Sequence, residues 1–174
     1  MTHTNRGADT LLKAMGAALL AAGPVMLWRS RSGRNEIRTE LAAQKITFPE
    51  RGLPAHLAPF AGRPLATGPE ARAFADMIKG NLARATDGRT YSEITAELHA
   101  AGNDEKLAKL RQTAFMAETL RASLMSAYQA WQLTSLVTGL GALLTGLGAA
   151  LVVAPRGDAA TGAAAVLPVL KDRS

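Results

Sequence analysis

Two apolar runs dominate the pattern of hydrophobic and polar positions along the chain. The first covers residues 14–28 and reaches eighteen residues when it is begun at Leu11, because Lys13 can extend its charge toward a membrane surface. The second, residues 133–154, is twenty-two residues long and has no charge. As a helix with ~1.5 Å rise per residue it spans roughly 33 Å, enough to cross a hydrocarbon layer of ~30 Å. The pattern therefore predicts two membrane-spanning helices.

The first run also has features of a secretory signal peptide, because Arg6 and Lys13 form a basic start before an apolar core. No A-x-A cleavage motif follows the core, however, and Arg29, Arg31 and Arg34 come immediately after it. We therefore expect an uncleaved signal anchor, with a cleaved signal peptide as the alternative.

The region between the runs begins with a polar segment, residues 32–44, that is predicted to be helical. Residues 45–49 alternate between polar and apolar side chains, as a short strand does. Five prolines follow at five-residue intervals from Pro49 to Pro69, and they exclude a continuous helix. Order in this proline-rich segment must therefore come from tertiary contacts.

Helical patterns resume at Pro69 and predict a helix to about Ala85, ended by a turn signal at residues 86–88. A short helix is predicted at residues 91–101, followed by a helix from Asp104 that continues without a Pro or Gly into the second apolar run. The side chains expected in the core of this region are those of Phe74, Ile78, Leu82 and Tyr91.

The fold class expected from these patterns is mainly α. It is a two-span transmembrane helical hairpin with a small helical loop domain and a long helix continuous with the second span. The expected parts are an N-terminal tail (1–10), a first transmembrane helix (11–28), an extramembrane loop domain (29–129), a second transmembrane helix (130–154) and a disordered C-terminal tail (155–174).

A seven-residue repeat, TGLGALL followed by TGLGAAL, lies inside the second apolar run, and two glycines of the first run have the same spacing. Small residues let helix backbones approach closely in lipid, where packing drives association. The repeat predicts either packing of the two spans against each other or a face that binds a partner. The predicted helix-packing residues are Gly16, Gly23, Thr138, Gly139, Gly141, Thr145, Gly146 and Gly148.

Aromatic and basic residues beside the runs are typical of membrane interfaces. The predicted interfacial anchors are Trp28, Arg121, Tyr128 and Trp131, with a lipid phosphate as the alternative contact of Arg121. Arginines are more numerous beside the central loop than beside the termini, which by itself favours a cytoplasmic loop. The rule weakens for loops longer than about 60 residues, and this loop is longer.

Composition narrows the function classes. Hydrophobic residues make up 48% of the 174 residues and aromatic residues 5%. The absence of cysteine excludes disulfides, thiolate metal sites and a cysteine nucleophile. The net charge of +6 suits anionic lipid headgroups, but basic residues are not interleaved with aromatics, so we expect no nucleic-acid partner. The chain contains no P-loop, nucleophile-elbow or zinc-protease signature.

Several segments resemble a group of small actinobacterial membrane proteins commonly labelled "aromatic ring-opening dioxygenase LigA". The most specific are ATDGRTYSE at residues 85–93 and LRASL at residues 120–124, and the resemblance covers most of residues 37–153. It implies a two-span protein of the plasma membrane whose termini are cytoplasmic and whose loop domain faces outside. This orientation and the one favoured by the arginine count are both open.

The family label implies an extradiol dioxygenase, which holds Fe(II) with two histidines and one carboxylate. The chain has only His3, His56 and His99. A site of His56, His99 and Glu97 matches that ligand set, but the spacing gives it no support. We therefore expect ordinary surface histidines, and no catalytic, cofactor-binding or metal-binding residue and no cofactor.

The function expected from the sequence is that of a non-catalytic integral membrane protein. It would be a structural or accessory component of an actinobacterial membrane or envelope complex. Its expected partners are the lipid bilayer and other membrane proteins or a second copy of itself. The alternatives are a ring-opening dioxygenase or its subunit, and a membrane-bound sensor or regulator.

Overall fold

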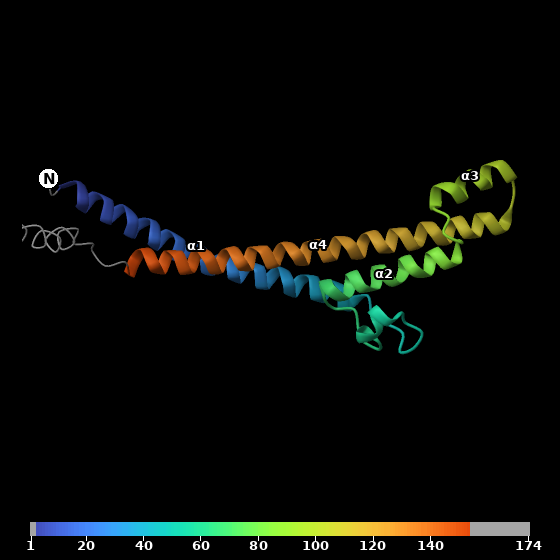
Figure 1. Ribbon diagram of the computed structural model, residues 1–174, viewed down its shortest axis with the longest axis horizontal. Helices are drawn as coiled ribbons and strands as arrows, with labels where there is room; N and C mark the ends of the chain where they lie inside the picture. The colour runs from blue at the N-terminus through green and yellow to red at the C-terminus, as the bar shows by residue number, and fades with distance from the viewer. Residues whose placement is uncertain (1–2, 154–174) are drawn as a thin grey trace, which may run out of the picture. The chain divides into compact units, whose positions relative to one another are not determined.

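The computed structural model describes residues 3–153, and most of them are helical (Figure 1). The described chain divides into two compact units. The first unit contains residues 3–26 and 140–153, and the second contains residues 27–139. The protein is mainly α, as predicted, and both predicted spans belong to long helices. The C-terminal tail predicted at residues 155–174 lies outside the described residues.

Helix α1 (His3–Ala43) is longer than the first span predicted from the sequence. It includes most of the segment predicted as an N-terminal tail, and it joins the first apolar run to the polar helix predicted at residues 32–44. The helix also passes through Pro24, which lacks the N–H that would bond to the carbonyl of Leu20. Alanine and leucine, which favour helices, are frequent on both sides of Pro24, and the helix continues through this position.

Helix α4 (Glu105–Val153) is one unbroken helix of 49 residues, as predicted. Asp104 caps its first turn: the Asp104 carboxylate accepts hydrogen bonds from the backbone N–H groups of Lys106 at 2.8 Å and Leu107 at 3.0 Å. No proline occurs between these residues and Val153, so the helix meets no steric stop in this interval.

Residues 44–67 connect α1 to α2 through an irregular segment. The alternation at residues 45–49 gives one antiparallel bridge, between Thr47 and Pro64, where a short strand was expected. The bridge is held because the N–H of Phe48 donates to the carbonyl of Arg63 at 3.0 Å. The prolines leave room only for the 3-10 helix η1 (Ala55–Phe60).

Order in the proline-rich segment comes from aromatic packing. The Phe48 side chain is 2% exposed. It stacks on Phe60 with ring centroids 5.4 Å apart and meets Phe74 edge-on at 5.1 Å. These contacts supply the tertiary order that the sequence required here.

Helix α2 (Gly68–Ala85) has the predicted bounds to within one residue, but its buried face differs from the expected one. The fully buried positions are mainly small residues, including Ala71, Ala73 and Ala75. Phe74 and Ile78 are half-buried and pack at the edges of the core. Small side chains are buried because α2 lies alongside α4 within residues 27–139 (Figure 1).

Helix α3 (Tyr91–Ala101) has the predicted bounds. The Thr90 hydroxyl accepts from the Glu93 N–H at 3.3 Å, and the Glu93 carboxylate accepts from the Thr90 N–H at 2.7 Å. Tyr91, expected in the core, is 41% exposed and contacts Phe115 with a centroid separation of 6.0 Å. The expected core position of Tyr91 is therefore wrong, because the first turn of α3 faces solvent.

The core of the second unit consists of two clusters that share Phe74. One joins α1, α2 and α4 through Leu41, Leu65, Ala71, Ala75 and Leu124, and the other joins η1 to α2 through Phe48, Leu57, Ala73 and Met77.

Candidate functional site

The apolar parts of α1 and α4 expose most of their large side chains. In the most apolar stretch of each helix only 11% of the residues are buried, and both helices are long and apolar enough to cross a membrane. Leu136 and Leu143, for example, are 71% and 73% exposed. Burying one leucine side chain away from water gains ~1.5–3 kcal/mol, so an apolar surrounding is strongly favoured along both helices.

In the first unit, α1 and α4 pack through glycines. A β-carbon added to Gly16 would lie 3.0 Å from the carbonyl oxygen of Gly148, and one added to Gly148 would lie 2.7 Å from the carbonyl oxygen of Gly16. A β-carbon on Gly23 would lie 2.7 Å from the carbonyl oxygen of Gly141 and would overlap the hydroxyl of Thr145. The order of these contacts makes the two segments antiparallel, with backbones closer than any larger residue allows.

The other predicted packing residues have different surroundings. Gly139 and Gly146 have no atom within 4 Å of where a β-carbon would lie. They are the first glycines of the two repeats, whereas the second glycines, Gly141 and Gly148, are buried. The repeat therefore has a packed side and an open side.

In the second unit, a polar contact joins α1 to α4 near the start of the apolar run. Ser30 is 3% exposed, and its hydroxyl donates to the carbonyl of Thr134 at 2.7 Å. The hydroxyl of Thr138 lies 2.6 Å from the Ser30 hydroxyl and 2.8 Å from the same carbonyl. Thr138, predicted as a packing residue, thus contributes a hydrogen-bonding group as well.

Arg34 extends this polar contact by one turn. Its Nε donates to the Thr134 hydroxyl at 3.1 Å, and its Nη2 donates to the Ser135 hydroxyl at 2.9 Å. The guanidinium carbon also lies 5.3 Å from the centre of the Trp131 ring. Arg38, one helical turn further, lies 5.5 Å from the same ring centre. Trp131 therefore holds two cations of α1.

The four predicted interfacial anchors lie in the second unit. Trp131 is also covered by α2, because a β-carbon on Gly68 would overlap its side chain. Tyr128 lies under Arg72, whose guanidinium carbon is 5.1 Å from the ring centre, whereas Trp28 is 67% exposed. Arg121 pairs with Glu118 at 2.8 Å. It precedes Leu133 by twelve residues, which is about 18 Å along the helix.

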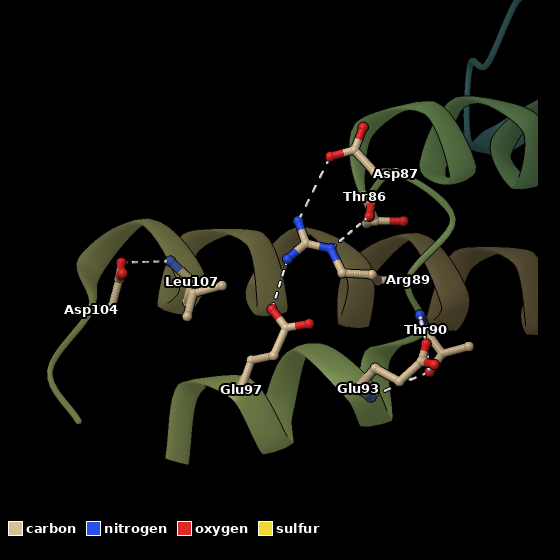
Figure 2. Close-up of polar contacts among 8 residues, drawn as sticks. All are labelled: Thr86, Asp87, Arg89, Thr90, Glu93, Glu97, Asp104 and Leu107. Carbon is tan, nitrogen blue, oxygen red and sulfur yellow. Dashed lines mark hydrogen bonds and ion pairs between the residues drawn. The ribbon is translucent and has the colours of Figure 1, made fainter. Parts of the chain in front are cut away.

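Arg89, in the turn between α2 and α3, is the centre of a group of polar contacts (Figure 2). Arg89 donates to the Thr86 carbonyl at 2.9 Å and to the Glu97 carboxylate at 2.7 Å, with Asp87 at 3.9 Å. Gly88 has a φ of 80°, which a glycine adopts without strain. The Arg89 side chain therefore links the end of α2 to α3.

Hydrogen bonds from Thr90 at the start of α3 lower the pKa of one carboxyl group, that of Glu93. The backbone N–H of Thr90, followed by its hydroxyl, holds the pKa of Glu93 below its ordinary value. Among the described side chains, the Thr86 hydroxyl is the one buried group without a hydrogen-bond partner.

An apolar groove of about 700 Å³ lies along α4 in the second unit. Its exposed lining residues include Phe115, Met116 and Leu120 of α4, beside the half-buried Ile78 of α2. The sequence prediction did not include Phe115 or Met116, and their adjacency in the chain is the available signal.

The two histidines considered as iron ligands, His56 and His99, lie on different helices. His56 is exposed on η1, whereas His99 is exposed on α3, where Glu97 is paired with Arg89. Among the residues that the structure describes, no three His, Asp or Glu side chains are grouped closely enough to hold a metal ion.

No protein-family model, curated protein or solved structure matches this chain. The functional reading therefore depends on its own residues. The contacts of Ser30, Arg34 and Gly68 with α4 were not predicted from the sequence. The one available signal was the seven-residue step from Gly23 to Ser30, which continues the spacing of Gly16 and Gly23.

Proposed function

We propose that the protein crosses the plasma membrane twice and acts as a non-catalytic, structural or accessory component of an actinobacterial membrane or envelope complex. The observation that carries this proposal is the exposure of the apolar side chains on α1 and α4. A helix in the core of a soluble protein buries such side chains, whereas here they are left for lipid. The glycine contact between the two apolar segments supports the same reading, because close backbone packing is typical of helices in lipid.

Membrane insertion is tested by extraction. We expect the protein to stay in the membrane pellet during an alkaline carbonate wash and to need detergent for solubility. Release by carbonate, or a monodisperse protein in buffer without detergent, would contradict the proposal. A cleaved signal peptide would appear as a mature chain lacking its first residues, which mass spectrometry of the purified protein detects.

Family membership is part of the proposal and is supported by the resemblance at residues 85–93 and 120–124. Several residues of the first segment stabilise the local structure. Thr90 and Glu93 cap α3, and Arg89 forms hydrogen bonds with Thr86 and Glu97. Because these residues stabilise structure, the resemblance supports a shared fold rather than a shared reaction.

The orientation proposed from the resemblance has the loop domain outside and both termini in the cytoplasm. The chain contains no cysteine, so one cysteine placed at Lys109, 76% exposed, gives a unique labelling site. A membrane-impermeant maleimide should label it in intact cells as fully as in permeabilised cells. Labelling only after permeabilisation would place the loop in the cytoplasm.

The accessory role implies contact with other membrane proteins or with a second copy. A photo-crosslinking residue at Met116, which is 62% exposed in the apolar groove, should give an adduct of defined mass. The same crosslinker at Lys109 is the matched control on the same helix. Equal adducts from both positions, or none from Met116, would contradict partner binding at this surface. Oxygen uptake with catechols in iron-loaded protein would instead establish the enzymatic alternative.

A further inference from the structure

Three arginines share one face of α1 just after its apolar run. Arg31, Arg34 and Arg38 are spaced at i, i+3 and i+7, which places them along one side of the helix. The acids of this segment are Glu36 and Glu40, two positions before and two positions after Arg38. On a helix, side chains two positions apart point in different directions. The face is therefore cationic along two turns.

The last two of these arginines, Arg34 and Arg38, both lie against the ring of Trp131. The guanidinium carbons of Arg34 and Arg38 lie 5.3 and 5.5 Å from the centre of the Trp131 ring. The ion pairs found among residues 3–153 join other residues, so neither guanidinium is neutralised by a carboxylate in the described structure. Like charges one turn apart destabilise a helix, so an anion between them is favoured.

The place of this pair indicates which anion is available. Arg34 donates to Ser135, and Leu133 and Leu136 beside it on α4 are exposed and apolar. Trp28, the one Trp, Tyr or Phe residue of α1, is exposed and lies within two turns of Arg34. Arginine forks match phosphate oxygens, and tryptophan is enriched at the level of lipid headgroups.

We propose that Arg34 and Arg38, held on Trp131 and assisted by Arg31, bind the phosphate of an anionic phospholipid. The inference rests on the proposed membrane insertion and adds the class of lipid that the protein selects. Arg34 is anchored by Thr134 and Ser135 and keeps Nη1 for the phosphate, whereas Arg38 has its ring contact alone and offers all its N–H groups.

The chain has two tryptophans, so Trp28→Phe leaves Trp131 as the single fluorescent reporter in the proposed site. In detergent micelles, phosphatidylglycerol or phosphatidylcholine is added at increasing mole fraction, and the midpoint of the Trp131 response is measured. Phosphatidylglycerol that remains bound after purification is counted by mass spectrometry. We expect a lower midpoint for phosphatidylglycerol than for phosphatidylcholine, and no displacement by inorganic phosphate at the same concentration.

Charge removal then tests the residues. At about 1 kcal/mol per arginine, R38Q should raise the phosphatidylglycerol midpoint roughly 5-fold and R34Q/R38Q roughly 25-fold. R38K, which keeps the charge, should recover most of the loss. The matched control is K106Q/R111Q, which removes two charges from α4 without touching Trp131, and it should leave the midpoint within about twofold of the parent.

Three results would overturn the lipid site. They are equal midpoints for the two lipids, equal loss in K106Q/R111Q and R34Q/R38Q, and displacement by inorganic phosphate. Resistance to carbonate extraction together with any of these results would leave the proposed function standing. Release by carbonate would refute the proposed function itself. R38Q alone keeps the hydrogen bonds of Arg34, so its loss of binding cannot be attributed to misfolding when the helical circular dichroism signal is unchanged.

Discussion

The two units of the protein hold the same pair of helices together in different ways. In the first unit, α1 and α4 meet through glycines whose backbones lie in contact, and the large side chains are exposed. In the second unit, the helices meet through buried side chains such as Leu41 and Leu124, and α2 adds a layer. Water drives the second kind of packing by expelling apolar surface, whereas lipid offers no such drive and leaves close fit as the main force.

This difference explains where each residue type occurs. Gly16 and Gly23 are followed at the next seven-residue step by Ser30 and then by Ile37, so one stripe of α1 changes from bare backbone to a hydroxyl to a branched side chain. The Ser30 contact with Thr134 and Thr138 is neither a glycine contact nor a buried apolar one, and it lies just after the first apolar run and at the start of the second. The change along α1 fits the proposed membrane topology, in which lipid surrounds the glycine end and water surrounds the Ile37 end.

The largest effect is expected from a substitution that disrupts the packing of buried side chains in the second unit. Phe48→Ala should lower the free energy of unfolding of the second unit by about 3–5 kcal/mol, because it empties the centre of the aromatic cluster. Amide hydrogen exchange of α2 in detergent measures this loss. Phe115→Ala is the control, since Phe115 is 53% exposed and its removal should cost less than about 0.5 kcal/mol. Faster exchange around Gly23 in Phe48→Ala would show that the two modes are not separable.

The next largest effect is expected from a substitution at the glycine contact between α1 and α4 in the first unit. Gly23→Ala should destabilise the apolar helix pair by about 1–3 kcal/mol, because its methyl group meets the carbonyl of Gly141 at 2.7 Å and backbone must move. Unfolding in mixed micelles of increasing dodecyl sulfate content measures the loss. Gly139→Ala and Gly146→Ala, where nothing lies within 4 Å, should be neutral or stabilising by up to about 1 kcal/mol. Equal damage from all three substitutions would refute a specific backbone contact.

A smaller effect tests the hydroxyl contact between the two modes. Ser30→Ala, Thr138→Ala and the double variant form a cycle, and their coupling energy should be about 0.6 kcal/mol, the average for such contacts in membranes. The same micelle unfolding experiment supplies all four stabilities. A coupling energy of zero would mean that the Thr134 carbonyl satisfies each hydroxyl independently.

The smallest effect is a dependence on pH confined to the second unit. The pKa of Glu93 is lowered by the Thr90 N–H, so the charged form is stabilised in the folded state. This contribution is present above the ordinary glutamate value of about 4.3 and is lost as the pH falls through the lowered value. The protection factors of the amides in the first turn of α3, each taken relative to the intrinsic exchange rate at the same pH, should therefore fall in acid. E93Q should show no such fall, and a fall that persists in it would assign the effect to another group.

Local signals predicted much of the fold. The bounds of α3 follow from Thr90 before it and from Gly102 after it, where φ is 76°. The start of α4 follows from Asp104, whose side chain caps the helix. The extent of α1 was less predictable, because apolarity marks the part of a helix that suits lipid and does not mark where the helix ends. The small buried face of α2 was missed because size alone does not show which side meets a neighbouring helix.

The contacts of the candidate site were harder to predict from the sequence, again because the sequence does not show which side of a helix meets its neighbour. The repeat singled out residues that the structure places in contact, including Gly23, Gly141 and Thr145, but also Gly139 and Gly146, which have open space beside them. Periodicity gives the spacing along one helix, whereas the choice of side requires the register with its partner. Arg34 with Ser135, and Gly68 with Trp131, likewise join positions distant in the chain, and such pairs leave no local pattern.

The separation of 108 residues between Ser30 and Thr138 has a consequence for biosynthesis. At about 5–20 residues per second, the ribosome needs roughly 5–20 s after Ser30 has been made to synthesise Thr138, its hydrogen-bond partner in α4. In the proposed membrane topology, the first helix would enter the bilayer during that interval with its hydroxyl and its two glycines uncovered. Another newly made helix would then have its best opportunity to contact this protein before translation is complete.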